Sequence, residues 1–344
     1  MSVCAEKADE DRFVREGRGL LETDCRRKGD GMTDQNDAQV ASFAGATTFM
    51  RRSLVADPQG WRQEKPDMIV FGVPFDIGTT NRPGARFGPR AIRAESLQLA
   101  WGPIWPWGFD PFDRLKVVDG GDVVFDWGRP QEMPERVKDS VCAMLRCGAV
   151  PVMLGGDHFC TLPVLRAMAE HVGEPLALIH FDAHRDVEAG TEEGRIDHGI
   201  VFSEALAEGL IVEEASVQIG IRTQYPDEGG QGMTVLDADW VHDQGADAVV
   251  AEIRRIIGTR PAYLSFDIDC LDPAFAPGTG TPVPGGLSTQ QARRILRGLA
   301  GLDIRGFDVM EVSPPYDPAG ITALAAALLA VDFCCLHVTR HFKG

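Results

Sequence analysis

The sequence lacks any apolar run of the roughly 18 residues that a membrane-spanning helix needs. Its best candidate, residues 323–331, is far too short and is followed by the charged Asp332. The first 19 residues also lack the apolar core of a secretory signal peptide. We therefore expect a protein that neither crosses nor binds a membrane.

Positive charge is scarce, with 34 Lys and Arg against 51 Asp and Glu and a net charge of −17. A surface this acidic argues against general binding to nucleic acids and is compatible with a small cationic substrate. Cys-x-x-Cys pairs are absent, and eight cysteines are scattered along the 344 residues. Scattered cysteines in a chain of this size are typical of reduced thiols, which favours a cytoplasmic location.

The chain changes character near residue 66. Residues 1–45 are polar, carry charges of both signs and contain two glycine-rich breaks, so we expect a flexible N-terminal extension. From residue 66 onward, short β-branched runs alternate with helical patterns, without a linker or an internal repeat. This continuous rhythm predicts one domain over residues 46–344.

Eight runs are predicted as strands, at residues 68–73, 115–118, 150–154, 176–181, 217–221, 234–236, 263–267 and 306–312. Helical patterns lie between them, such as residues 136–146, 161–171, 247–257 and 289–299. Apolar strands separated by helices predict an α/β fold with three layers, in which helices cover both faces of a doubly wound, mostly parallel eight-stranded sheet. Ligands of such sheets bind at the carboxyl ends of the strands.

Three predicted strands end in Asp and His residues. The segments are Leu154-Gly155-Gly156-Asp157-His158, His180-Phe181-Asp182-Ala183-His184-Arg185-Asp186 and Phe266-Asp267-Ile268-Asp269. Alternation along an extended chain would place Asp182, His184 and Asp186 on one face. Carboxylates that converge at one edge of the sheet would repel one another without cations. Six ligands, two imidazoles and four carboxylates, suit a pair of divalent first-row metals such as Mn²⁺ or Ni²⁺.

Several runs, taken together and in this order, resemble the ureohydrolase family of arginases and agmatinases, and its agmatinase branch most closely. Besides the three segments above, they are Gly-Val-Pro-Phe-Asp-Ile-Gly at 72–78, Arg-Pro-Gly-Ala-Arg-Phe-Gly-Pro at 82–89, Pro-Gly-Thr-Gly-Thr-Pro at 277–282 and Glu-Val-Ser-Pro-Pro-Tyr-Asp at 311–317. The resemblance implies an arginase-like fold and a dinuclear metal centre in a hydrolase of linear amidines. It also implies a trimer or hexamer, either homo- or hetero-oligomeric.

By position, the resemblance assigns His158, Asp182, Asp186 and Asp267 to one metal. It assigns His184, Asp182, Asp267 and Asp269 to the other, so that Asp182 and Asp267 bridge. A hydroxide shared by the two metals would attack the guanidinium carbon, with Asp186 orienting it. The resemblance further implies that His198, in the Asp197-His198-Gly199 run, carries a proton to the leaving amine and that Glu311 pairs with the substrate guanidinium.

Three features depart from the agmatinase pattern: Phe159 after His158, Arg185 inside the second segment, and a short loop at residues 223–230. They leave the metal ligands alone and change their surroundings, which favours a small guanidine or a biguanide such as metformin as substrate. Agmatine and guanidinobutyrate remain alternatives. A third alternative is a non-catalytic subunit that supports a hetero-oligomeric ureohydrolase.

Overall fold

The computed structural model describes residues 41–190, 194–225, 230 and 232–341. Residues Thr47–Gly344 group into one compact unit and Met1–Ala46 into another. Of the smaller unit, residues 41–46 are described, and the Ala44 amide donates a hydrogen bond of 2.9 Å to the Ala41 carbonyl. The predicted flexible extension lies mostly outside the described residues and stays a prediction.

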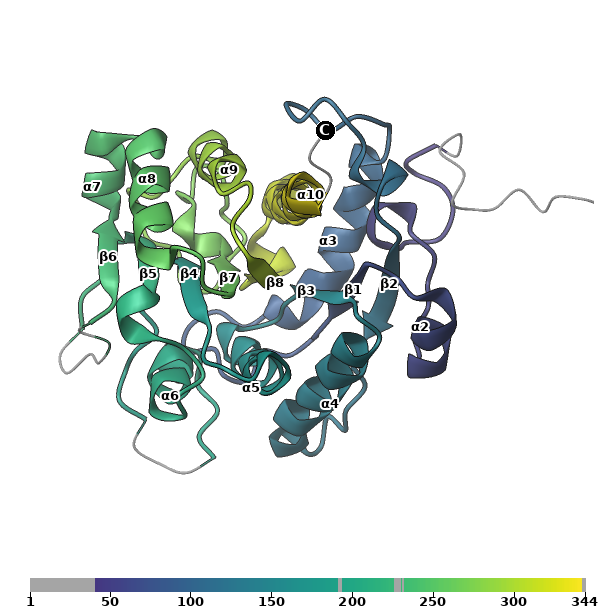
Figure 1. Ribbon diagram of the computed structural model, residues 1–344, viewed down its shortest axis with the longest axis horizontal. Coiled ribbons are helices and arrows are strands. Elements are labelled where there is room, and N and C mark those ends of the chain that lie inside the picture. Colours follow the sequence, from purple (N-terminus) through teal and green to yellow (C-terminus); the bar gives the residue numbers. More distant parts are fainter. Residues whose placement is uncertain (1–40, 191–193, 226–229, 231, 342–344) are drawn as a thin grey trace, which may run out of the picture. The chain divides into compact units, whose positions relative to one another are not determined.

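The larger unit contains an eight-stranded sheet in which every strand pairing is parallel (Figure 1). The strands are β1 (Met68–Gly72), β2 (Val117–Asp122), β3 (Val150–Leu154), β4 (Ala177–Phe181), β5 (Val217–Ile221), β6 (Thr234–Asp237), β7 (Ala262–Asp267) and β8 (Ile304–Met310). Their order across the sheet is β2-β1-β3-β8-β7-β4-β5-β6. The predicted fold class is confirmed, and each predicted strand overlaps an observed one.

Helices cover both faces of the sheet (Figure 1). One face carries α3 (Gly88–Ser96), α7 (Ala238–Gln244), α8 (Ala246–Ile257), α9 (Thr289–Gly298) and α10 (Ile321–His341). The other carries α2 (Pro58–Glu64), α4 (Met133–Arg146), α5 (Thr161–Val172) and α6 (Val201–Ala207). Alternation along β1 explains the two layers, because Met68 and Val70 pack into one cluster while Ile69 and Phe71 pack into the other.

The apolar run at residues 323–331, which we expected to be short, is part of the long helix α10. The segment Pro318–Arg340 is long and apolar enough to cross a membrane by composition, but 72% of its most apolar window is buried inside the protein. Asp332 lies inside this helix and does not end it. Its fully buried carboxylate pairs with Arg293 at 2.6 Å and accepts a hydrogen bond from Trp107 Nε1. These contacts are those of a core helix.

Candidate active site

Four neighbouring strands in the middle of the sheet deliver the predicted site residues at their carboxyl ends. His158 follows β3, residues 182–186 follow β4, Asp267 ends β7 and Glu311 follows β8. These strands are adjacent in the order β3-β8-β7-β4. The parallel topology therefore brings together residues that lie more than 150 positions apart in the sequence.

The first cluster surrounds the imidazole of His158. Its Nδ1 atom lies 3.2 Å from an oxygen of Asp182, 3.0 Å from one of Asp186 and 3.2 Å from one of Asp267. His158 and Asp182 are fully buried, and Asp267 is nearly so. The structure thus brings the four residues predicted for one metal to a common point.

The second cluster lies on the other side of Asp182. His184 Nδ1 is 3.4 Å from Asp182 Oδ1 and 3.0 Å from Asp269 Oδ2, while Asp182 Oδ2 faces His158. Each oxygen of Asp182 therefore faces a different cluster, which is the arrangement that a bridging carboxylate requires. Two groups of side chains here have the composition and spacing of a metal site, namely His158, His180, Asp182 and Asp186, and Asp182, His184 and Asp269.

The donor atoms fit cations better than they fit one another. His158 Nδ1 is buried among carboxylates yet has no hydrogen-bond partner in the part of the chain that the structure describes. Burial and the negative charges of Asp269 and Asp182 raise the pKa of Asp267 well above its usual value. Two divalent cations would satisfy the imidazole nitrogen and neutralise the carboxylates, so the predicted metal chemistry suits these residues.

The path of the chain differs from the predicted alternation. Strand β4 ends at Phe181, and residues 182–186 form an irregular loop in which Asp186 has a φ of 53°. Glu311 is likewise left-handed, with a φ of 61°. Left-handed backbone is unfavourable for residues other than glycine, and such residues are concentrated at functional sites. The side chains of Asp182, His184 and Asp186 therefore converge because this loop turns, and not because they alternate along an extended strand.

Buried hydrogen bonds hold the candidate ligands from behind. Asp182 Oδ2 accepts from His180 Nε2 at 2.8 Å, and Asp182 Oδ1 accepts from the His184 amide at 2.6 Å. The far nitrogen of His158 lies 2.8 Å from the hydroxyl of Ser265, which donates to Asp308. The sequence analysis gave no role to His180, Ser265 or Asp308. The signal available for them was a polar residue inside an otherwise apolar strand.

His198 and Glu311 contact each other directly. His198 Nδ1 lies 2.8 Å from Glu311 Oε1, which also accepts a hydrogen bond of 3.0 Å from the His158 amide. His198 Nε2 lies 2.7 Å from the hydroxyl of Thr80, a residue that the sequence analysis did not single out. Burial lowers the pKa of His198, but the hydrogen bond to Glu311 and the charges of Glu311 and Asp186 outweigh it and raise the pKa to about 10.

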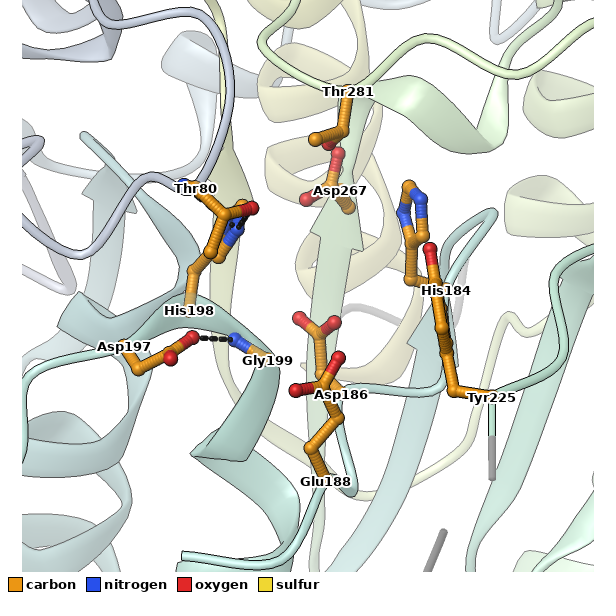
Figure 2. A pocket seen from close by; sticks show the side chains of 10 residues that line it. All are labelled: Thr80, His184, Asp186, Glu188, Asp197, His198, Gly199, Tyr225, Asp267 and Thr281. Atoms are coloured by element: carbon orange, nitrogen blue, oxygen red, sulfur yellow. Dashed lines mark hydrogen bonds between the residues drawn. The ribbon is translucent and has the colours of Figure 1, made fainter. Parts of the chain in front are cut away.

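A pocket opens onto both clusters (Figure 2). Figure 2 shows Thr80 and His198 on one side and His184 and Tyr225 on the other, with carboxylates between them. The lining residues are Thr80, His184, Asp186, Glu188, Asp197, His198, Gly199, Tyr225, Asp267 and Thr281. Glu311 is 1% exposed and does not line the pocket, so it lies behind His198.

Two of the three departures from the agmatinase pattern point away from this pocket. Phe159 is buried among apolar side chains, and it lines a different cavity with Leu162 and Ile200. The side chain of Arg185 extends to Gln218 and Gly230. The third departure is the short loop at residues 223–230. Its Tyr225 lines the pocket, and its residues 226–229 lie outside the described part of the chain. Neither Phe159 nor Arg185 therefore supplies the predicted change in the pocket wall.

Comparison with known proteins gives consistent matches. Residues 66–335 match the model of the arginase family. An agmatinase from Chromobacterium violaceum is 50% identical over 303 residues, which cover 88% of this chain and 92% of that protein. The crystal structure of a hypothetical agmatinase from Burkholderia thailandensis is 51% identical, with a TM-score of 0.83 over 87% of this chain and 93% of that chain. The proclavaminate amidino hydrolase of Streptomyces clavuligerus is 39% identical, with a TM-score of 0.80 over 88% and 100% of the two chains.

Proposed function

The chain belongs to the arginase family and to its agmatinase-like branch, so it is a ureohydrolase that acts on a guanidino C–N bond, and we propose that its substrate is agmatine. Agmatine carries a guanidinium group at one end of a four-carbon chain and an ammonium group at the other. The relatives named as agmatinases support this choice over the biguanide. They give no support to a non-catalytic subunit.

The observation that carries the proposal is a free carboxylate in the pocket. Asp186 and Asp267 belong to the clusters, and Asp197 is paired with Arg195. The backbone of Glu188 pairs with Gly199 and Ser203, but its carboxylate makes no hydrogen bond or ion pair with any residue that the structure describes. Burial and the charges of Asp197 and Asp186 raise the pKa of Glu188, so a cation placed there would relieve repulsion. We assign Glu188 as the acceptor of the agmatine ammonium group.

The family's dinuclear chemistry gives the two clusters their role. His158, Asp182, Asp186 and Asp267 would hold one metal, and His184, Asp182, Asp267 and Asp269 the other. The ligand set, rich in oxygen with two imidazoles, favours Mn²⁺ and also accepts Ni²⁺. When bound, the two cations supply a water molecule of lowered pKa as the nucleophile.

His198 and Glu311 complete the chemistry. His198 Nε2 faces the pocket, where it accepts a hydrogen bond of 3.2 Å from the Thr80 amide and lies 2.7 Å from the Thr80 hydroxyl. A proton taken up at Nε2 replaces the bond from the amide and can pass to the leaving amine. Glu311 Oε1 holds the imidazole. Glu311 Oε2 is buried without a hydrogen-bond partner among the described residues, but Glu311 does not line the pocket, so its pairing with the substrate guanidinium stays a prediction.

A substrate panel tests the proposal. The purified chain is loaded with Mn²⁺ or Ni²⁺, and kcat/KM is measured on agmatine, 4-guanidinobutyrate, guanidine and metformin by the release of urea and of amine. We expect agmatine to be the best substrate. A higher kcat/KM on guanidine or metformin would overturn the choice of substrate. Metal-loaded chain that hydrolyses none of the four would favour the non-catalytic subunit.

The assembly and the location of the enzyme remain predictions. Trp101 and Trp105 are exposed in the loop that precedes β2, which suits the expected trimer or hexamer. Sedimentation of the purified chain tests it, and a monomer would contradict it. Six cysteines of the described chain are free thiols, as a reducing cytoplasm requires.

A further inference from the structure

A chain of hydrogen bonds connects the backbone at Gly230 to Asp182. Arg185 Nη2 donates to the carbonyl of Gly230 at 2.8 Å, and Arg185 Nε donates to Gln218 Oε1 at 2.9 Å. Gln218 Nε2 lies 3.1 Å from His180 Nδ1, and His180 Nε2 lies 2.8 Å from Asp182 Oδ2. His180 on β4 and Gln218 on β5 are register partners, and both are fully buried.

The chemistry of arginine fixes the direction of every bond in this chain. A guanidinium group has donors only, so the atom of Gln218 that faces it must be the amide oxygen. The amide NH₂ group then points the other way and donates to the Arg185 carbonyl at 2.7 Å and to His180 Nδ1. Because Nδ1 accepts, the ring proton of neutral His180 sits on Nε2 and is donated to Asp182.

We propose that Arg185 is a positioning residue that fixes the bridging carboxylate of the metal centre through Gln218 and His180. One donor then holds each oxygen of Asp182, namely His180 Nε2 on one side and the His184 amide on the other. Each oxygen keeps a lone pair for one cation. The inference does not depend on which guanidino compound is the substrate.

Without the Arg185 side chain, Gln218 Oε1 would lose its donor and the orientation of the amide would be less firmly held. Rotating the Gln218 amide by half a turn would then break only its hydrogen bond to the main-chain carbonyl of residue 185, whereas in the parent chain it also breaks the bond from Arg185 Nε. The rotated amide would present its oxygen to His180 Nδ1, which would move the ring proton to that atom. The lone pair on Nε2 would then face the negative oxygen of Asp182, and the carboxylate would lose its support. Removal of such outer partners typically weakens metal binding by about 10- to 100-fold.

A double-mutant cycle tests the proposal through metal affinity. Arg185→Met, Gln218→Met and the double variant are titrated with Mn²⁺ against a competing chelator. We expect each single variant to bind Mn²⁺ about 10- to 100-fold more weakly than the parent chain. We expect the double variant to bind no more weakly than Gln218→Met alone, because Arg185 acts through Gln218. Arg166→Met is the matched control, since Arg166 pairs with Glu208 and does not line the substrate pocket.

Two results would overturn the proposal. One is a Mn²⁺ affinity of Arg185→Met within twofold of the parent chain. The other is a double variant whose loss is the product of the two single losses, because independent effects multiply. Circular dichroism of the metal-free variants shows whether they fold. If Arg185→Met does not fold, Arg185→Lys is compared with Gln218→Met in the same cycle, and the same two results apply.

Discussion

Replacing Glu188 by Gln removes one negative charge from the pocket and leaves the side chain almost the same size. Glu188 lines the pocket and is partly exposed, so solvent weakens its interaction with an ammonium group. A hydrogen bond between charged groups at such a position is worth about 1.5–2 kcal/mol, at the low end of its range. At 1.36 kcal/mol per factor of ten, kcat/KM on agmatine should fall about 10- to 30-fold, mainly through KM.

The comparison that isolates this effect uses a substrate without the ammonium group. Butylguanidine has the same carbon chain and guanidinium as agmatine, so Glu188→Gln should leave its kcat/KM unchanged. Activity on 4-guanidinobutyrate should rise, because the variant no longer repels the carboxylate. Glu174→Gln, at an exposed position outside the pocket, is the matched control.

The reasoning would be refuted if Glu188→Gln kept the parent ratio of agmatine to butylguanidine within twofold. That result differs from failure of the proposed function, in which the parent chain itself would not hydrolyse agmatine. Metal content, measured on every variant, must stay constant for the comparison to hold.

Asp182→Asn should cost both metals, because each carboxylate oxygen faces a different cluster; elemental analysis that finds two metals per chain in this variant would contradict the assignment. His198→Asn should keep its metals and lower kcat by about 10²- to 10⁴-fold, the usual cost of losing a general acid, and an unchanged kcat would exclude His198 as the proton donor. Asp332→Asn should lower the free energy of unfolding by about 3 kcal/mol because it removes the buried negative charge that pairs with the mostly buried Arg293, whereas Asp247→Asn, in an exposed pair with Arg294, should cost less than about 1 kcal/mol. Urea denaturation measures both, and equal costs would contradict the difference in burial.

The sheet and the candidate metal ligands were predictable because each has a local signal in the sequence. Apolar runs such as residues 150–154 and 217–221 are buried on both faces of a parallel sheet, so they are continuous and easily recognised. Asp182, His184 and Asp186 stand together directly after such a run. The parallel pairing of β4 with β7 places them beside Asp267, and the turn of the loop at residues 182–186 brings the side chains together.

The supporting residues could not be predicted, because their roles depend on neighbours across the sheet. Gln218 is one polar residue in an apolar strand, and its importance follows only from the register that places it beside His180. Glu311 was assigned to the substrate from its place at a strand end, whereas the structure also pairs it with His198. The side chain of Arg185 points away from the pocket, toward Gln218, beside the left-handed turn at Asp186. Such a turn leaves no pattern in the sequence.

The order of the strands also governs when the active site can form during synthesis. Strands β2, β1 and β3 make one half of the sheet and β7, β4, β5 and β6 the other, and β8 pairs with both halves as their only connection in the sheet. His158 belongs to the first half, and the other candidate metal ligands belong to the second. A ribosome makes β8 last of the eight, so a nascent chain that has not yet reached residue 304 holds the two sets of ligands on separate sheets. The first cluster can therefore be completed only after β8 has been made, when this strand joins the two halves and brings His158 to the other ligands.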